Sequence, residues 1–307
     1  MWGSSTGVEA LAVEPPGRTE FWVADRGSDR LLGLDRDLFI TESITMRAPT
    51  RLAPAPGGGV FVANAAEGWP GGAHVLRYMC PGADVRWERS IGPLVDLQSD
   101  GRDAVLVEAQ RAGEARCTVL SVGPAGVLRR VVAGDVLCAA RRAESFLVGF
   151  ESGLLQLWAG DATYPLAEVD VGGSVTDIAL ARDAGWWILS RRAGAGTQLA
   201  LLDAALATRW ARTTIAGAVA VIPGAGAQAW CATGERGPLR RYGPGGDAEL
   251  EVESILMTLD RGVALSDGGL LWLAPGALLR LDAEGLVRPG QGGFGFLADV
   301  IEARLDP

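Results

Sequence analysis

The sequence predicts an all-β fold, a seven-bladed β-propeller of four-stranded antiparallel blades. The main observation is a short apolar run, preceded by a turn, that recurs about every 42 residues, a repeat length typical of propeller blades. A second observation is the abundance of turn residues, 43 glycines and 16 prolines, without an amphipathic helix pattern long enough for βαβ units. The second residue of each apolar run is, in order, Trp22, Phe61, Leu106, Leu147, Trp187, Trp230 and Trp272.

Each repeat is expected to contain four strands in the same order. An apolar first strand, such as 177–181, leads through a turn to the bulky second strand. A third strand, such as 30–35, ends near an acid or a glycine, and a tight turn leads to a more polar fourth strand, such as 85–91. The pattern predicts a single propeller domain, 1–307, with blades at approximately 8–48, 49–92, 93–134, 135–172, 173–215, 216–256 and 257–307.

The bulky second-strand side chains are expected between blades, because seven radially stacked sheets cover each other's faces. A ligand platform is the alternative interpretation for Trp22, Trp187, Trp230 and Trp272. Closure of the ring has two solutions, because segment 297–307 repeats the first-strand pattern. It forms either the outermost strand of the last blade or a strand beside 8–13, and both would protect a sheet edge.

Composition excludes several classes of protein. With 48% hydrophobic residues, the 307-residue chain can bury a substantial core, which excludes intrinsic disorder. A net charge of −9 argues against a nucleic-acid partner, and the absence of lysine excludes Schiff-base and Walker-type lysine chemistry. No apolar run reaches the roughly 18 residues of a membrane helix. We therefore expect no membrane span, and a location that is cytoplasmic, or extracytoplasmic if a signal peptide has been removed.

The four cysteines contain no CxxC pair and are too few for a disulfide framework. We expect isolated, reduced cysteines in the core. A bridge between Cys117 and Cys138 is the alternative, because the repeat places them in neighbouring units.

The first repeat carries a recognisable motif. Segment 23–35, VADRGSDRLLGLD, resembles the NHL repeat, with Asp25, Arg30 and Asp35 at matching positions and Asp29 near the usual asparagine. Later repeats keep only the hydrophobic pattern. The resemblance implies a propeller of the NHL or a related type, a group dominated by binding proteins that also includes some enzymes.

Charged residues recur at the start of the first strands. The aligned positions carry Glu9, Arg51, Asp96, Asp135 and Asp177, and Asp299 has the same place in the extra strand. Innermost strands line a propeller's channel, so these carboxylates could ring one mouth and hold Ca²⁺ or another hard cation. Alternatively, each Asp accepts hydrogen bonds from backbone N–H groups and ties one blade to the next. Arg51 would offset part of the negative charge.

Two kinds of enzyme can be weighed against these residues. Metal-dependent lactonases of the gluconolactonase type are similar in propeller form and use Glu, Asn and Asp ligands around the axis. Glu9 fits such a site, but the only asparagine, Asn64, lies on a second strand. A Ser-His-Asp triad has little support, because His74 is the only histidine and no G-x-S-x-G elbow is present.

The leading functional hypothesis is a non-catalytic binding or assembly propeller that presents loops and one face to a protein partner, alone or as a subunit of a larger complex. The candidate partner-binding residues are Trp69, His74 and Arg51, with Trp69 in the middle of the long insertion 65–74. Trp69 could instead shield a blade edge or cover a ligand. The alternative function is a lactonase-like hydrolase or a ligand-sensing propeller with an acidic channel mouth.

Overall fold

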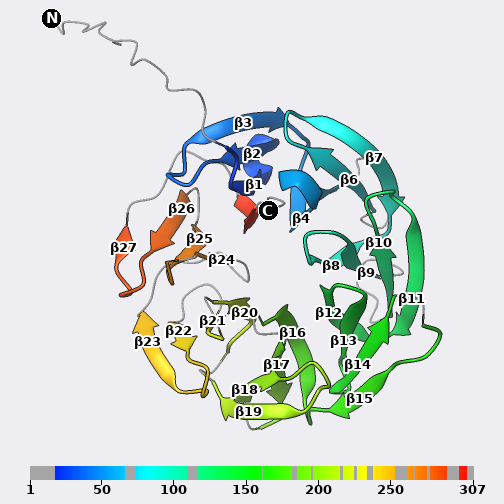
Figure 1. Cartoon of the computed structure of the whole chain (residues 1–307), viewed down its shortest axis with the longest axis vertical. Helices are drawn as coiled ribbons and strands as arrows, with labels where there is room; N and C mark the ends of the chain where they lie inside the picture. The colour runs from blue at the N-terminus through cyan, green and yellow to red at the C-terminus, as the bar shows by residue number, and fades with distance from the viewer. Residues whose placement is uncertain are drawn as a thin grey trace, which may run out of the picture.

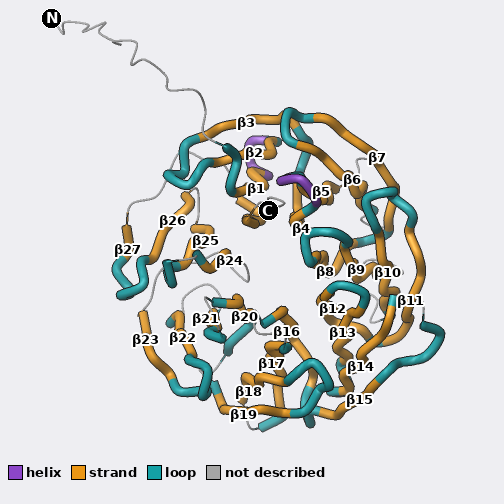
Figure 2. Tube along the Cα trace, viewed as in Figure 1, coloured by secondary structure: helices purple, strands orange, loops and turns teal. Residues whose placement is uncertain are grey.

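The computed structural model consists almost entirely of β-strands arranged in a ring (Figure 1). Its only helical elements among the described residues are two 3-10 turns, η1 (Arg26–Ser28) and η2 (Pro56–Gly58), drawn purple in Figure 2. The structure describes residues 18–65, 73–109, 116–160, 162–181, 185–194, 196–214, 217–224, 227–233, 238–252, 262–265, 267–274, 277–288 and 297–302.

Seven four-stranded antiparallel sheets form the blades, each ordered from the inner to the outer strand. Blade 1 contains β28 (Leu297–Glu302), β1 (Phe21–Asp25), β2 (Arg30–Leu34) and β3 (Ile40–Thr45). Blade 2 contains β4 (Pro49–Pro54), β5 (Val60–Ala65), β6 (His74–Cys80) and β7 (Asp84–Ile91). Blade 3 contains β8 (Leu94–Ser99), β9 (Ala104–Ala109), β10 (Cys117–Val122) and β11 (Leu128–Gly134).

The remaining blades follow the same plan. Blade 4 contains β12 (Val136–Arg142), β13 (Ser145–Phe150), β14 (Leu154–Ala159) and β15 (Ala167–Asp170). Blade 5 contains β16 (Ser174–Leu180), β17 (Trp186–Arg192), β18 (Gly196–Leu202) and β19 (Thr208–Thr213). Blade 6 contains β20 (Ala220–Pro223), β21 (Ala229–Ala232), β22 (Leu239–Tyr242) and β23 (Ala248–Val252). Blade 7 contains β24 (Gly262–Ala264), β25 (Leu270–Ala274), β26 (Ala277–Leu281) and β27 (Val287–Arg288). The predicted fold class is confirmed.

The ring is closed by the last strand of the chain. β28 pairs with β1 in antiparallel register, with Val300 opposite Val23, and so supplies the inner strand of blade 1 (Figure 1). The first expected solution is wrong, because 297–302 is the inner strand of blade 1 and not the outermost strand of the last blade. The second placed the segment beside 8–13, which lies outside the described residues. Blade 1 thus joins the two ends of the described chain, because its other three strands come from residues 21–45.

All seven predicted second-strand residues are fully buried. Five of them face the following blade, whereas Leu106 and Trp272 face the preceding blade. Leu106 packs in the cluster that contains Phe61 of the preceding blade. Trp272 pairs directly with Gly262, where an added Cβ would meet Ile222 of the preceding blade. Paired residues share a sheet face, so Trp272 also points backward, and Val105 and Leu271 are the positions equivalent to the other five.

The antiparallel order of the blades defines two faces of the ring. Connections from the first to the second strand and from the third to the fourth strand of each blade lie on one face, which we call the turn face. Connections from the second to the third strand, and from one blade to the next, lie on the other, the loop face.

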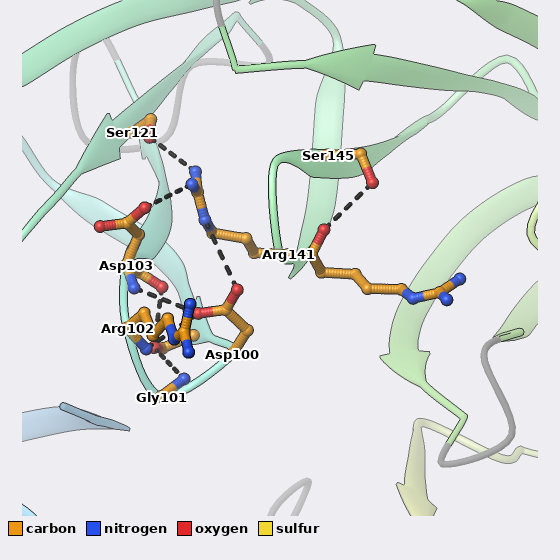
Figure 3. Close-up of polar contacts among 9 residues, drawn as sticks. Asp100, Gly101, Arg102, Asp103, Ser121, Arg141 and Ser145 are labelled. Atoms are coloured by element: carbon orange, nitrogen blue, oxygen red, sulfur yellow. Dashed lines mark hydrogen bonds and ion pairs between the residues drawn. The ribbon is translucent and has the colours of Figure 1, made fainter. Parts of the chain in front are cut away.

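A buried arginine connects two blades near the turn face. Arg141, at the end of β12 and 4% exposed, reaches blade 3, where its guanidinium donates to Asp103 Oδ2 at 2.5 Å and to Ser121 Oγ at 2.9 Å (Figure 3). Asp100 accepts the backbone N–H groups of Arg102 and Asp103, which closes the turn that Arg141 contacts. Arg141 therefore belongs to the contact between blades 3 and 4.

Candidate functional site

The inner strands surround a central channel with a cavity of about 730 Å³. Its wall is mixed: leucine, valine, isoleucine and alanine residues of six inner strands and Val300 of β28 line it together with polar residues such as Gln98, Ser99 and Thr176. The charged lining residues are Arg51, Asp96, Arg142 and Asp177. The channel is therefore a mixed site, in which charged and polar groups lie beside apolar ones.

A β-bulge recurs in the inner strands of five consecutive blades, blades 1 to 5. The register shifts between Pro49 and Arg51 in β4, and an equivalent shift occurs in β28, β8, β12 and β16. A bulge inserts one extra residue and redirects the side chain that follows it. The residues at the equivalent position after the bulge are Asp299, Arg51, Asp96, Cys138 and Asp177.

The carboxylate of Asp177 is occupied by backbone donors. Its Oδ1 accepts the N–H of Ile178 at 2.9 Å, and its Oδ2 accepts the N–H of Val221 in blade 6 at 2.8 Å. Asp96, which is buried, accepts the N–H of Leu97 at 2.9 Å in the same local geometry. Asp177 thus connects the inner strands of blades 5 and 6, as expected for an aspartate that fastens one blade to the next.

The predicted ring of carboxylates is only partly assembled. Asp96 and Asp177 line the channel, but Asp135 is exposed before β12 and does not line it. In blade 4 the sequence repeat placed Asp135 at this position, but the equivalent residue is Cys138, three residues further along the chain. Glu9 lies outside the described residues. Within the described part of the chain, no group of three or more His, Cys, Asp and Glu side chains could hold a metal ion.

Cys138 lies between the two channel aspartates in the ring of blades. Burial raises the pKa of its thiol well above the ordinary value, and the charges of Asp177 and Asp96 raise it further. Its Sγ contacts the carbonyl oxygen of Val175 at 3.8 Å. All four cysteines are free, so Cys117 and Cys138 are not bridged; Cys117, Cys138 and Cys231 are buried as expected, whereas Cys80 is half-buried.

Two of the three predicted partner-binding residues lie within the described part of the chain. Arg51 is half-buried in the channel wall. His74 is half-buried at the start of β6, where its Nδ1 accepts the backbone N–H of Leu94 in blade 3 at 3.2 Å. This contact gives His74 a role between blades 2 and 3. Trp69 lies outside the described residues.

The structure reveals an apolar surface that the sequence analysis missed. Among the described residues, eight of the nine exposed large hydrophobic residues lie in the turn before an outer strand or in its first residues. Phe39 is 63% exposed, Tyr164 71% and Leu286 65%. They belong to blades 7, 1, 2, 3 and 4, which are consecutive around the ring. We call this surface the apolar arc: Leu286, Val287, Phe39, Ile40, Val85, Val127, Tyr164 and Leu166.

A sequence signal for the arc exists. Phe39, Val127 and Leu286 each follow a tight turn at the one position where blades 5 and 6 carry Ala207 and Asp247. A large apolar residue at that exposed position recurs across repeats, which a search for core positions overlooks because the residue is adjacent to a strand.

Comparison with known proteins adds information on the fold alone. No family model and no curated protein matches the chain. The solved β-propeller domain of Cps50 (Swd1) from Myceliophteria thermophila aligns with a TM-score of 0.60 at 11% identity, over 86% of this chain and 93% of that chain. Saccharomyces cerevisiae Sqt1 aligns with a TM-score of 0.61 at 11% identity, over 90% and 84%. A streptogramin B lyase aligns with a TM-score of 0.62 at 10% identity, over 89% and 87%. The chain has a β-propeller fold.

At this level of identity, the neighbours carry no functional assignment to this chain. No helix among the described residues is long and apolar enough to cross a membrane.

Proposed function

We propose that this chain is a non-catalytic binding propeller that docks a protein partner on the apolar arc of its turn face. The observation that carries the proposal is the confinement of exposed large side chains to consecutive blades on one rim. Contiguous exposed apolar surface marks interaction sites, and aromatic residues such as Phe39 and Tyr164 are enriched at interfaces. Blades 5 and 6, with Ala207 and Asp247, would lie outside the interface.

A protein partner is favoured over a lipid surface by charge. The chain carries a net charge of −9. An anionic membrane repels such a chain, and stable attachment to membranes usually combines apolar insertion with a basic patch. Arg36, Asp37, Asp84 and Arg86 border the arc as exposed residues of both signs, which suits the polar rim of a protein interface.

The NHL resemblance of blade 1 remains part of the proposal. Asp25 is fully buried, and its Oδ1 accepts the N–H of Ser28 while its Oδ2 pairs with Arg30 at 2.7 Å. Oδ1 of Asp35 accepts the N–H groups of Asp37 and Phe39. Asp25, Arg30 and Asp35 thus each have a structural task in a turn of blade 1, which supports a relationship to the NHL repeat.

The test compares an arc variant with a matched variant of the same face. The arc variant combines Phe39→Ser, Tyr164→Ser and Leu286→Ser, and the control combines Ala207→Ser and Asp247→Ser. Because all five side chains are exposed, melting temperatures should change little in either variant. Proteins that co-purify with the wild-type chain are identified, purified and titrated against each variant.

The arc variant should bind the purified partner at least tenfold more weakly than the wild type, a loss of about 1.4 kcal/mol, and the control should bind normally. Equal affinity for both variants would overturn the placement of the interface. Co-sedimentation with lipid vesicles that the arc variant loses would replace the protein partner with a membrane.

A further inference from the structure

The central channel has the size of a ligand site and is separate from the arc. Its cavity of about 730 Å³ lies within the range of roughly 300–1,000 Å³ that small-molecule sites occupy. Ligand sites combine an apolar wall with a few placed polar groups. The channel offers both kinds of group, with the partly exposed Leu137, Leu180 and Val263 among its apolar residues and Gln98 and Ser99 among its polar ones.

The charges in the wall select the class of ligand. Asp96 and Asp177 are the only carboxylates among the described lining residues. Both oxygens of Asp177 and one of Asp96 accept backbone N–H groups, which disperses their negative charge within the protein. A bound cation would have to compete with these bonds, so the carboxylates do not favour one.

The two arginines of the wall lie at different depths. Arg51 and Cys138 hold equivalent positions after the bulges, and Arg142 lies four residues further along β12. At about 3.3 Å per residue, the two arginine positions are separated by roughly 13 Å along the channel, with Arg142 toward the turn face. Arg142 is thus remote from both aspartates, whereas Arg51 lies at their level.

We propose that the central channel binds a small elongated organic anion, with its charged group on Arg142 and its apolar body against the channel wall. Arg142 is also engaged within the protein. A guanidinium has five N–H donors in a planar fork, so it can keep an internal contact and still receive a carboxylate or sulfonate. The separation of the two arginines leaves room for a chain of several carbons, which would pack against apolar residues such as Leu180.

The probe is octanoate, whose extended length is roughly 10 Å from C–C bonds of about 1.5 Å. The full chain is titrated calorimetrically with octanoate, octanol and octylammonium, each below its aggregation range. Octanoate should bind with one molecule per chain, octanol at least tenfold more weakly, and octylammonium without detectable heat. Absence of octanoate binding, or octylammonium binding equal to it, would overturn the proposal.

Three variants locate the site. Arg142→Gln should weaken octanoate at least tenfold, Arg142→Lys should weaken it less than Arg142→Gln because it keeps the charge but not the planar fork, and the exposed outer-strand control Arg129→Gln should change nothing. Val95→Trp adds bulk to a channel residue that is already 38% exposed, so it should block octanoate without disturbing the core. Unchanged affinity in Val95→Trp would place the octanoate elsewhere and sink the proposal. If Arg142→Gln does not fold, the proposal is still tested by the titrations of the wild type with octanoate, octanol and octylammonium and by the titration of Val95→Trp with octanoate.

Discussion

The indole of Trp87 donates its Nε1–H to the carbonyl oxygen of Pro124 at 2.7 Å, joining the outer strand of blade 2 to the outer turn of blade 3. The same contact recurs three blades on, where Trp210 donates to the carbonyl oxygen of Pro244 at 2.7 Å. Both prolines belong to a G-P-x-G turn, residues 123–126 and 243–246. Two distant repeats therefore use the same contact between neighbouring blades.

The last glycine of each turn makes the contact sterically possible. Gly126 and Gly246 have φ of +71° and +82°, and a Cβ on either would lie 2.7–2.8 Å from the tryptophan ring. In blades 1 and 5 the same turn position holds Leu38 and Leu206, also at positive φ, and the leucine itself packs into the core between blades. Either the outer strand or the turn supplies the large side chain at this junction.

The first prediction concerns this junction. Gly126→Ala should destabilise the protein by more than the roughly 1–2 kcal/mol of left-handed strain, because the new Cβ also meets the Trp87 ring. In a Trp87→Ala background, the same substitution should cost only the strain. Chemical denaturation of the four proteins in a double-mutant cycle measures the coupling.

Gly82→Ala is the matched control for this cycle. Gly82 occupies the corresponding turn of blade 2 with φ of +85°, and nothing lies within 4 Å of its ideal Cβ. Its cost should equal the strain alone and should not depend on Trp87. Strict additivity between Gly126→Ala and Trp87→Ala would contradict the steric account.

How much of this could be predicted from sequence depends on the range of the interaction. The repeat length and the buried runs predict the seven blades, because strand pairing within a blade is local. The sequence could not show toward which neighbouring blade Leu106 and Trp272 point. Each is flanked by other apolar residues on its strand, so both faces of the strand are apolar. The inner strand of blade 1 was missed because β28 and β1 are joined only by closure of the ring.

The site was predicted less well for a related reason. The Asp177 carboxylate was placed correctly at the inner strand, and its bonding to Val221 follows one of the two stated alternatives. Asp135 was misplaced because the alignment followed an acidic residue, whereas the equivalent position in blade 4 holds the uncharged Cys138, three residues further on. The apolar arc depends on which side of a turn is left uncovered by the neighbouring blade, and that information is absent from a single repeat.

The second prediction concerns closure of the ring. Deletion of residues 297–307 removes the strand that pairs with β1 and leaves the inner edge of blade 1 open. The melting temperature should fall sharply, and a synthetic peptide of 296–307 added in trans should restore it in a concentration-dependent way. Thermal unfolding followed by circular dichroism measures both effects. A truncated chain as stable as the wild type would contradict closure by β28.

The third prediction concerns the channel aspartates. Asp177→Ala should destabilise the protein by about 2–4 kcal/mol, because it leaves the N–H groups of Ile178 and Val221 without their acceptor. The exposed Asp135→Ala serves as the control and should stay within about 0.5 kcal/mol of the wild type. EDTA should leave the wild-type melting temperature unchanged. A chelator-induced drop that Ca²⁺ reverses would instead make the channel carboxylates metal ligands.

The fourth prediction concerns alkaline stability. Cys231 is fully buried, and burial raises the pKa of its thiol from 9.0 to about 12, with a further contribution from the charge of Asp177. In the unfolded chain the thiol ionises at its ordinary pKa, so the unfolded state loses its proton first as the pH rises. The stability that this group contributes is therefore complete below about pH 9 and declines between about 9 and 12, with a limiting slope of about 1.4 kcal/mol per pH unit.

Because the chain has no lysine, the other groups that titrate in this pH range are mainly three tyrosines and the other cysteines. Cys231→Ser and Cys231→Ala should both show a shallower decline by about that slope, whatever their stability at neutral pH, since both remove the titrating thiol. Denaturant unfolding at a series of pH values measures it, and a slope identical to that of the wild type in both variants would show that the thiol ionises alike in the two states.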